Sequence, residues 1–203
     1  MDKQKKKIVT AFVLMLCVAA VVLVVYYVIT RQSKDTGEEK EPGTEVEKLL
    51  AKDLDTKYPE TPAEVVKLYW RFNKCMYNDE MDDEEFEKLL EQLRELYDEE
   101  FLAREENSWE NMLSSFKSDR EDYRSNKRNI AMYSVEPNSS TVYGDVDGKE
   151  CAYVMCNALI KQKSERTKVY EKFMCRDDGE GKWKILGWEQ LDSQDDEEDG
   201  KNN

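Results

Sequence analysis

An uncharged apolar segment near the start of the chain limits most strongly what the chain can fold into. It spans residues 8–29, from Ile8 to Ile29, and contains 22 residues without a charged side chain. A helix rises about 1.5 Å per residue, so this segment would be about 33 Å long, enough to cross a hydrocarbon core of about 30 Å. The sequence therefore predicts a transmembrane helix over residues 8–30.

The flanks of this segment favour a retained anchor over a cleaved signal peptide. The apolar part of a secretory signal usually has about 7–15 residues and ends in a small-x-small site. This run is longer, and Thr30 and Arg31 follow it. Four lysines precede it within residues 1–7, and positive residues stay in the cytoplasm. We therefore expect a single-pass protein of the cell membrane, with a cytoplasmic N-terminus and an extracytoplasmic domain.

Composition excludes several kinds of function. The 203 residues include no histidine, which excludes His-dependent catalytic triads and His-containing zinc sites. Residues 31–203 carry 27 Lys and Arg against 44 Asp and Glu, a net charge of −17. Such a surface repels phosphate, so we expect no nucleic-acid partner. No residue pattern indicates a cofactor or a metal ion, and neither is predicted.

Changes in composition along the chain predict its domain organisation. Residues 31–43 and 193–203 contain no large apolar side chain, which is typical of a flexible tether and a disordered end. The predicted segments are a basic cytoplasmic end at 1–7, the transmembrane helix at 8–30, a tether with a short helix at 31–60, an extracytoplasmic domain at 61–192 and an acidic disordered tail at 193–203.

Hydrophobic periodicity predicts helices first and strands afterwards. A period of 3.6 residues indicates helices over 44–54, 61–78, 82–100 and from 109 onward. Beyond Asn129 the pattern becomes strand-like, which indicates strands over 130–136, 141–146, 151–162, 167–176 and 182–191. This order predicts an α+β domain with an antiparallel sheet.

One of these strands is expected at the centre of the sheet. Residues 151–162 are apolar on both faces, whereas a strand with one face in water alternates apolar and polar residues. We expect helices on one face of this strand. A dimer partner or the domain's own curled sheet would cover the other.

Three segments carry a resemblance to a known superfamily. They are TPAEVVKLYWRFNKCMYN at 61–78, LYDEEFLA at 96–103 and GKWKILGWEQL at 181–191. Together they resemble the nuclear transport factor 2-like superfamily over residues 61–192. With the N-terminal anchor, the chain also looks like an uncharacterised family of short membrane-anchored proteins from Gram-positive bacteria. The resemblance implies a cone-shaped pocket between helix and sheet, and members that act as enzymes, binding modules, assembly modules or dimers formed through the sheet.

The apolar residues expected to line this pocket come from one helix and two strands. The positions of Trp183 and Trp188 differ by five, an odd number, so the two side chains are expected on opposite faces of the sheet. Only one of them can then line the pocket. Ordinary packing in the core or an interface is the alternative role for these aromatic residues. The predicted lining is Tyr69, Trp70, Phe72, Tyr153, Met155 and Trp183.

Glu171 is the only strong candidate for a catalytic carboxylate. Enzymes of the superfamily often use a His–Asp pair, which this chain lacks, or an Asp with tyrosines in the pocket. Val169, Glu171 and Phe173 alternate with their neighbours and therefore share one strand face. An exposed edge position or an ion pair with a lysine is the alternative for Glu171, and no catalytic residue is predicted.

Four cysteines lie beyond the predicted membrane segment, and none of them form a Cys-x-x-Cys motif. Buried free thiols are the favoured interpretation for all four. A hairpin turn centred near residues 164–166 would place Cys156 nearly opposite Cys175, so a cross-strand disulfide between these two is an alternative. A site with four cysteines around zinc is a further one.

Together these features predict a membrane-anchored extracytoplasmic binding or interaction module that is not an enzyme. Its partners would be the membrane, through residues 8–29, and a second copy or an envelope protein, through the sheet. The first alternative is an assembly subunit of an envelope secretion or conjugation complex. The second is a small pocket enzyme that acts on an apolar ligand without histidine.

Overall fold

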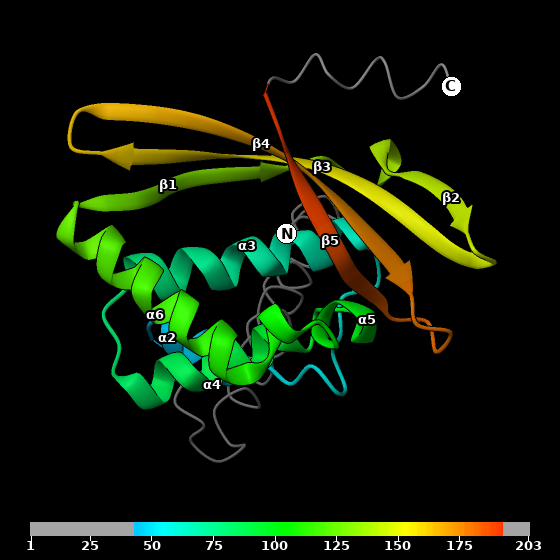
Figure 1. Ribbon diagram of the computed structural model, residues 1–203, viewed down its shortest axis with the longest axis horizontal. Helices are drawn as coiled ribbons and strands as arrows, with labels where there is room; N and C mark the ends of the chain where they lie inside the picture. Colours follow the sequence, from blue (N-terminus) through cyan, green and yellow to red (C-terminus); the bar gives the residue numbers. More distant parts are fainter. Residues whose placement is uncertain (1–42, 193–203) are drawn as a thin grey trace, which may run out of the picture. The chain divides into compact units, whose positions relative to one another are not determined.

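The computed structural model describes residues 43–192, which belong to one compact unit of the chain. The predicted basic end, transmembrane helix and acidic tail lie outside the described residues. Among residues 43–192, no helix is both long enough and apolar enough to cross a membrane. The described part is an α+β domain with helices first and an antiparallel sheet afterwards, as predicted (Figure 1).

The helices begin where the capping signals place them. Thr44 and Thr61 each form a capping box, with Glu47 and Glu64 respectively, and Asp82 forms a third one. Each box satisfies backbone N–H groups that the first helical turn leaves without partners. The helices are α2 (Glu45–Leu50), α3 (Pro62–Asn78), α4 (Asp83–Arg94), α5 (Glu99–Leu102) and α6 (Trp109–Ser125), with short 3-10 turns at Glu105–Asn107 and Asn138–Ser140.

The predicted helix over 82–100 is interrupted. Helix α4 ends at Arg94 because the next residues pair with the last strand of the sheet instead of continuing the helix. The Ile185 N–H donates to the Leu96 carbonyl at 2.7 Å, and the Asp98 N–H donates to the Ile185 carbonyl at 2.9 Å. Asp98 then caps the short helix α5. The first helix is also shorter than predicted, ending at Leu50.

A strongly twisted antiparallel sheet forms the second layer (Figure 1). The central strand β3 pairs with β4 along one edge and with β1 and β2 along the other, and β5 pairs with β4. The prediction that residues 151–162 form a central strand is confirmed. The strands are β1 (Arg128–Val135), β2 (Val142–Val146), β3 (Lys149–Gln162), β4 (Glu165–Asp177) and β5 (Trp183–Leu191).

Helix α3 lies against one side of this sheet, which we call the inner side. Ala152, Val154, Cys156 and Ala158 of β3 point to this side and are buried. The Trp70 indole on α3 donates to the Cys156 sulfur at 3.1 Å, which fixes the helix against the strand. The small side chains of β3 let the helix approach closely.

Most of the outer side of the sheet is not covered by the described helices, and only the start of α5 reaches it, where Glu100 bonds Arg176. Tyr153 and Met155 of β3 point outward and are partly exposed. Met132 is 60% exposed and Val142 50% exposed, and their strand partners Leu159 and Tyr153 place both on this side. The outer side of the described sheet therefore presents exposed apolar residues, with charged ones such as Lys168 and Lys172 among them.

A bulge in β5 corrects one prediction about the tryptophans. Met174 pairs with Gly187 and Cys175 pairs with Ile185, so one extra residue, Leu186, is inserted in β5. The insertion reverses the alternation of faces along the strand. Trp183 and Trp188 therefore lie on the same, inner side, and the prediction that they face opposite sides is wrong.

Candidate functional site

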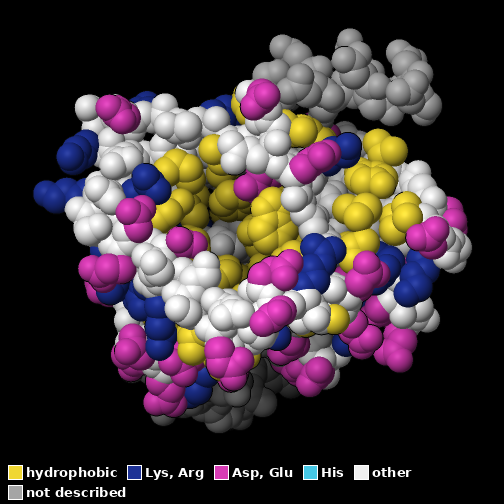
Figure 2. Space-filling view, in the orientation of Figure 1, with side chains coloured by type: hydrophobic (Ala, Val, Ile, Leu, Met, Phe, Trp, Pro, Cys, Tyr) yellow, Lys and Arg dark blue, Asp and Glu magenta, His cyan; other side chains and the backbone are white. Residues whose placement is uncertain are grey.

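A hollow opens between the sheet and helix α6, beside strand β5. Figure 2 shows that hydrophobic side chains line it. Helix α3 lies beneath it in the same orientation (Figure 1). The inner sides of β4 and β5, helix α3, helix α6 and the segment between α4 and α5 all contribute aromatic residues to this region.

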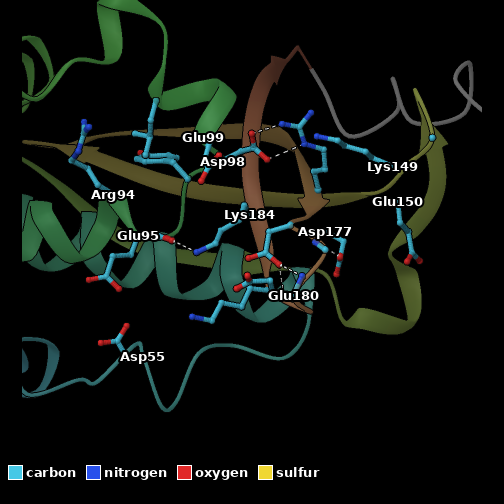
Figure 3. Close-up of a pocket in the computed structure, with 17 residues that line it drawn as sticks. Asp55, Arg94, Glu95, Asp98, Glu99, Lys149, Glu150, Asp177, Glu180 and Lys184 are labelled. Atoms are coloured by element: carbon cyan, nitrogen blue, oxygen red, sulfur yellow. Dashed lines mark hydrogen bonds and ion pairs between the residues drawn. The ribbon is translucent and has the colours of Figure 1, made fainter.

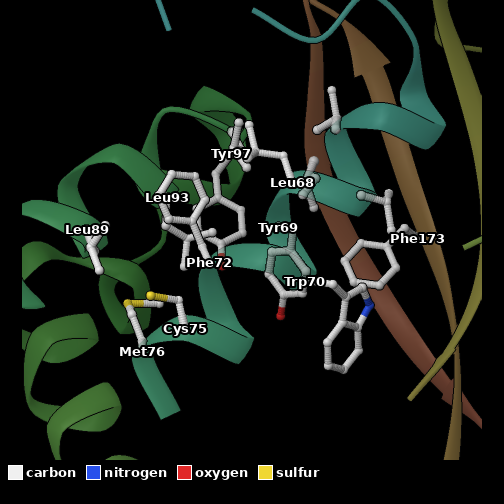
Figure 4. Packing of buried hydrophobic residues seen from close by; sticks show 14 of the residues in the cluster. Leu68, Tyr69, Trp70, Phe72, Cys75, Met76, Leu89, Leu93, Tyr97 and Phe173 are labelled. Carbon is white, nitrogen blue, oxygen red and sulfur yellow. The ribbon is translucent and has the colours of Figure 1, made fainter. Parts of the chain in front are cut away.

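Two groups of aromatic rings border the region. In the first, the ring centroid of Tyr69 lies 5.0 Å from that of Phe173 and 5.6 Å from that of Trp188. Tyr97 joins this group, with its centroid 6.3 Å from Tyr69 (Figure 4). Trp188 is 39% exposed, so one ring of this group reaches the surface. The group is an apolar wall with an open edge.

The second group lies on α3 and α6. The ring of Tyr77 stacks on Tyr123 at 4.6 Å and on Phe116 at 6.1 Å. All three rings are only partly buried. Tyr69 and Tyr77 are eight residues apart on α3, a little over two turns, so the two groups are neighbours along one helix.

Four tyrosines of this region lie close enough to interact electrostatically with one another or with Glu171. Burial is the main cause that raises the pKa of Tyr69, Tyr77, Tyr97 and Tyr123, and several of these groups raise one another's pKa further. Such mutual effects require the groups to be close. No hydrogen bond joins these hydroxyls to one another within residues 43–192, and the buried Tyr97 hydroxyl has no partner there. We call the space bordered by these four tyrosines and Glu171 the tyrosine hollow.

Glu171 is the acidic group of the tyrosine hollow. Its strand partner on β3 is Cys156, so its side chain points to the inner side, as the alternation predicted. The residue is partly buried, and its Oε2 atom is fully buried without a hydrogen-bond partner among the described residues. Burial raises the pKa of this carboxyl to about 7. The same carboxyl contributes to the raised pKa of Tyr69, Tyr97 and Tyr123.

No cation compensates this carboxyl within the described residues. Burial is the single cause of its shifted pKa, so neither Lys nor Arg acts on it appreciably. Two arginines act electrostatically on the neighbouring tyrosines Tyr97 and Tyr123, and both bond other groups. Arg128 bonds Asp122 at 3.1 Å, and Arg94 bonds the Asn107 carbonyl at 2.9 Å. An acid in this environment exchanges its proton near neutral pH, and it can accept or donate a hydrogen bond.

The predicted pocket residues are not brought together. Tyr69 lies in the first aromatic group and borders the hollow. Trp70 is buried, bonds the Cys156 sulfur and stacks on Tyr133 at 6.1 Å, and Phe72 is fully buried in the core (Figure 4). Both therefore have packing roles.

The three predicted residues from the strands are also displaced from the hollow. Tyr153 and Met155 point to the outer side, so their assignment to the pocket is wrong. Trp183 is on the inner side but at the far end of β5, where its ring contacts Tyr143 at 5.7 Å and its carbonyl accepts from the Tyr58 hydroxyl at 2.9 Å. The residues missing from the prediction are Tyr77, Tyr97, Tyr123 and Trp188, which periodicity marks only as apolar positions of their helices or strand.

The predicted alternative of a Cys156–Cys175 disulfide is wrong. Cys75, Cys151, Cys156 and Cys175 are all free and buried. Gln162 pairs with Glu165, so the hairpin turn is only two residues long and lies earlier than expected. This register places Cys156 opposite Glu171 and Cys175 opposite Ala152.

A second cleft is lined by charged residues (Figure 3). Its volume is about 770 Å³, and its walls include Glu95, Asp98, Lys149, Arg176 and Lys184. The Arg176 guanidinium donates to both carboxylate oxygens of Asp98, and these bonds raise the pKa of Arg176. The Lys184 ammonium donates to the backbone carbonyl of Glu95 at 2.6 Å. Arg176 and Asp98 are therefore paired within the protein, and the bonds of Arg176 and Lys184 hold the α4–α5 segment to β4 and β5. No cluster of three or more metal-binding side chains occurs among residues 43–192.

Sequence comparison identifies a family for the chain. A family model described as a domain of unknown function (DUF6715) matches residues 1–188. No curated protein matches the sequence. The matched residues include the predicted membrane segment and nearly all of the described domain. The chain therefore belongs to the DUF6715 family.

Proposed function

We propose that the protein is a membrane-anchored, extracytoplasmic module that binds a small, largely apolar ligand in the tyrosine hollow. The single observation that carries this proposal is that two buried polar atoms which interact electrostatically, Glu171 Oε2 and the Tyr97 hydroxyl, have no hydrogen-bond partner among the described residues. Buried polar groups normally have hydrogen-bond partners, so two neighbouring ones without partners favour a site that a ligand completes. The aromatic rings supply the apolar walls.

The anchor and the outer side of the sheet complete this proposal. Residues 8–29 would hold the domain at the outer surface of the membrane, as the lysines before them indicate. The exposed apolar residues of the outer side, such as Met132 and Val142, would contact a second copy or an envelope protein. The order of helices and a twisted sheet, with a hollow between them, supports the resemblance to the nuclear transport factor 2-like superfamily.

A ligand-binding experiment with a matched pair of variants tests the proposal. The full chain is placed in phosphatidylcholine nanodiscs, and binding of 2-phenylethanol is measured by saturation-transfer NMR against empty nanodiscs. Val169 is partly buried on the inner side, two residues from Glu171, so Val169→Phe fills the hollow. Lys168 is exposed on the outer side, so Lys168→Phe adds the same bulk elsewhere.

We expect the unchanged protein and Lys168→Phe to bind the probe and Val169→Phe to lose binding by about tenfold or more. Equal binding by the two variants would place the probe outside the hollow and contradict the proposal. Absence of binding to the unchanged protein at millimolar probe would also contradict it.

A small pocket enzyme acting on an apolar ligand is the second candidate function. The observation that favours it is the pKa of Glu171, raised by burial to about 7, because a general base works best when its pKa is near the working pH. The test is deuterium exchange at the methyl group of acetophenone in D₂O, followed by NMR. Exchange that is lost in Glu171→Gln and retained in Glu189→Gln would support an enzyme. Exchange no faster than with empty nanodiscs would contradict it.

A further inference from the structure

The carboxyl of Glu171 lacks the positive charge that buried acids normally have nearby. Ionised acids inside proteins are usually paired with a cation or bonded to several donors. Glu171 has neither among the described residues, and burial alone sets its pKa. Arg94 and Arg128, which act electrostatically on Tyr97 and Tyr123, bond other groups. A positive charge from a ligand would complete this site.

The groups around Glu171 suit one kind of positive charge. The rings of Tyr69 and Trp188 and the rings of Tyr77 and Tyr123 border the hollow from two sides. Electron-rich aromatic faces attract an ammonium group, and a carboxylate gives it a strong charge-assisted hydrogen bond. The Tyr97 hydroxyl, which has no partner, can accept a further N–H.

We propose that the ligand of the tyrosine hollow is a small organic amine in its protonated form, held by the Glu171 carboxylate with its apolar part against the aromatic rings. This proposal rests on the proposed binding function and specifies its ligand class. An anionic ligand would be repelled by the uncompensated negative charge of the Glu171 carboxylate. A neutral apolar ligand would leave both buried polar atoms without partners, which costs binding free energy.

Three probes of nearly equal shape separate these cases. Phenethylamine is cationic at pH 8, 2-phenylethanol is neutral, and 3-phenylpropanoate is anionic. Their affinities for the full chain are measured by calorimetry in phosphatidylcholine nanodiscs, whose lipid carries no net charge. We expect phenethylamine to bind at least about tenfold more tightly than 2-phenylethanol, and 3-phenylpropanoate to bind most weakly.

The variant pair assigns this preference to one carboxyl. Glu171→Gln should remove the preference for the amine, so that phenethylamine and 2-phenylethanol bind this variant about equally. Glu189→Gln is the matched control, because the Glu189 side chain is 61% exposed and bonds Lys172 on the outer side. It should keep the preference, which excludes a general attraction of cations to the acidic surface. A preference that persists in Glu171→Gln would overturn the proposal.

The pH dependence of the unchanged protein gives a test that needs no variant. Between pH 5.5 and 8, Glu171 should change its charge, whereas the titratable groups that face it should not. Burial raises the pKa of the facing tyrosines and of the Cys156 thiol above this range. Those groups are Tyr69 of α3, Tyr97, Tyr123 of α6 and Cys156 of β3, with the uncharged Gln190 on β5.

The affinity for phenethylamine should therefore fall about tenfold or more from pH 8 to 5.5, while that for 2-phenylethanol stays constant. An amine affinity independent of pH would overturn the amine proposal. Binding of 2-phenylethanol without any preference for the amine would overturn it while the proposed binding function stands. Absence of binding by all three probes would contradict both.

Discussion

Replacing Glu171 by Gln should stabilise the protein, and the gain should grow with pH. Burial raises the pKa of this carboxyl from an ordinary 4.5 to about 7. The folded state therefore keeps the proton over a pH range in which the unfolded state has lost it, and the free energy of unfolding falls as pH rises from 4.5 to 7. Gln has nearly the same shape as protonated Glu and cannot ionise, so the variant escapes this loss.

The magnitude follows from the shift in pKa. Each unit corresponds to about 1.4 kcal/mol, so the full shift corresponds to about 3 kcal/mol at pH 8 and about 1.4 kcal/mol at pH 5.5. Partial exposure of Glu171 to solvent makes these values upper bounds. We therefore expect the advantage of Glu171→Gln over the unchanged protein to roughly double between pH 5.5 and 8. Both pH values lie above the isoelectric point of about 4.7, which avoids precipitation.

Urea unfolding followed by tryptophan fluorescence measures this difference. The full chain in nanodiscs is unfolded at both pH values, and other groups that titrate contribute equally to the two proteins. Glu189→Gln, on the outer side, should show no gain and should change the free energy of unfolding by less than about 1 kcal/mol. If Glu171→Gln is destabilising at pH 8, the carboxylate has a favourable partner in the fold, and the reasoning about an uncompensated charge is refuted.

Three further predictions concern the rest of the chain. Asp98→Asn should lower the free energy of unfolding by about 3 kcal/mol in a urea titration, because Arg176 loses its buried partner. Glu100→Gln should lower it by less than about 1 kcal/mol because Glu100 is exposed, and equal losses in the two variants would contradict this prediction. A reducing agent should leave the melting temperature unchanged, because the four described cysteines are free, and a drop would reveal a disulfide. Residues 8–30 should keep the full-length chain in the membrane fraction after a carbonate wash, and release of a shortened protein would show a cleaved signal instead.

Local signals in the sequence predicted the elements well. The capping boxes at Thr44 and Thr61 and the change from helical to alternating periodicity depend on neighbouring residues only, so the order of elements and most of their ends could be predicted. Helix α4 was predicted too long because residues 95–98 keep a helical pattern. Their backbone instead pairs with Ile185, almost ninety residues away, which no local pattern reports.

The faces of the strands were harder to predict than the strands themselves. Strand β3 is apolar on both faces, so hydrophobicity could not decide which face meets the helices, and Tyr153 and Met155 were assigned to the wrong one. The inserted Leu186 reversed the alternation in β5, and a turn of only two residues shifted the register of Cys156. In β4, which has no bulge before Met174, alternation predicted correctly that Glu171 shares a face with Phe173.

The tyrosine hollow depends on three-dimensional proximity that no single segment carries. Its hydroxyls come from α3, α6 and the α4–α5 segment, where each tyrosine fits an ordinary apolar stripe. Glu171 departs from what packing requires at its position, since an apolar residue there would leave no buried carboxyl oxygen without a partner. A side chain that lowers the stability of the fold at neutral pH is explained by what it binds or does. This is why we propose ligand binding in the hollow around Glu171, and not in the charged cleft, where Arg176 and Asp98 already satisfy each other.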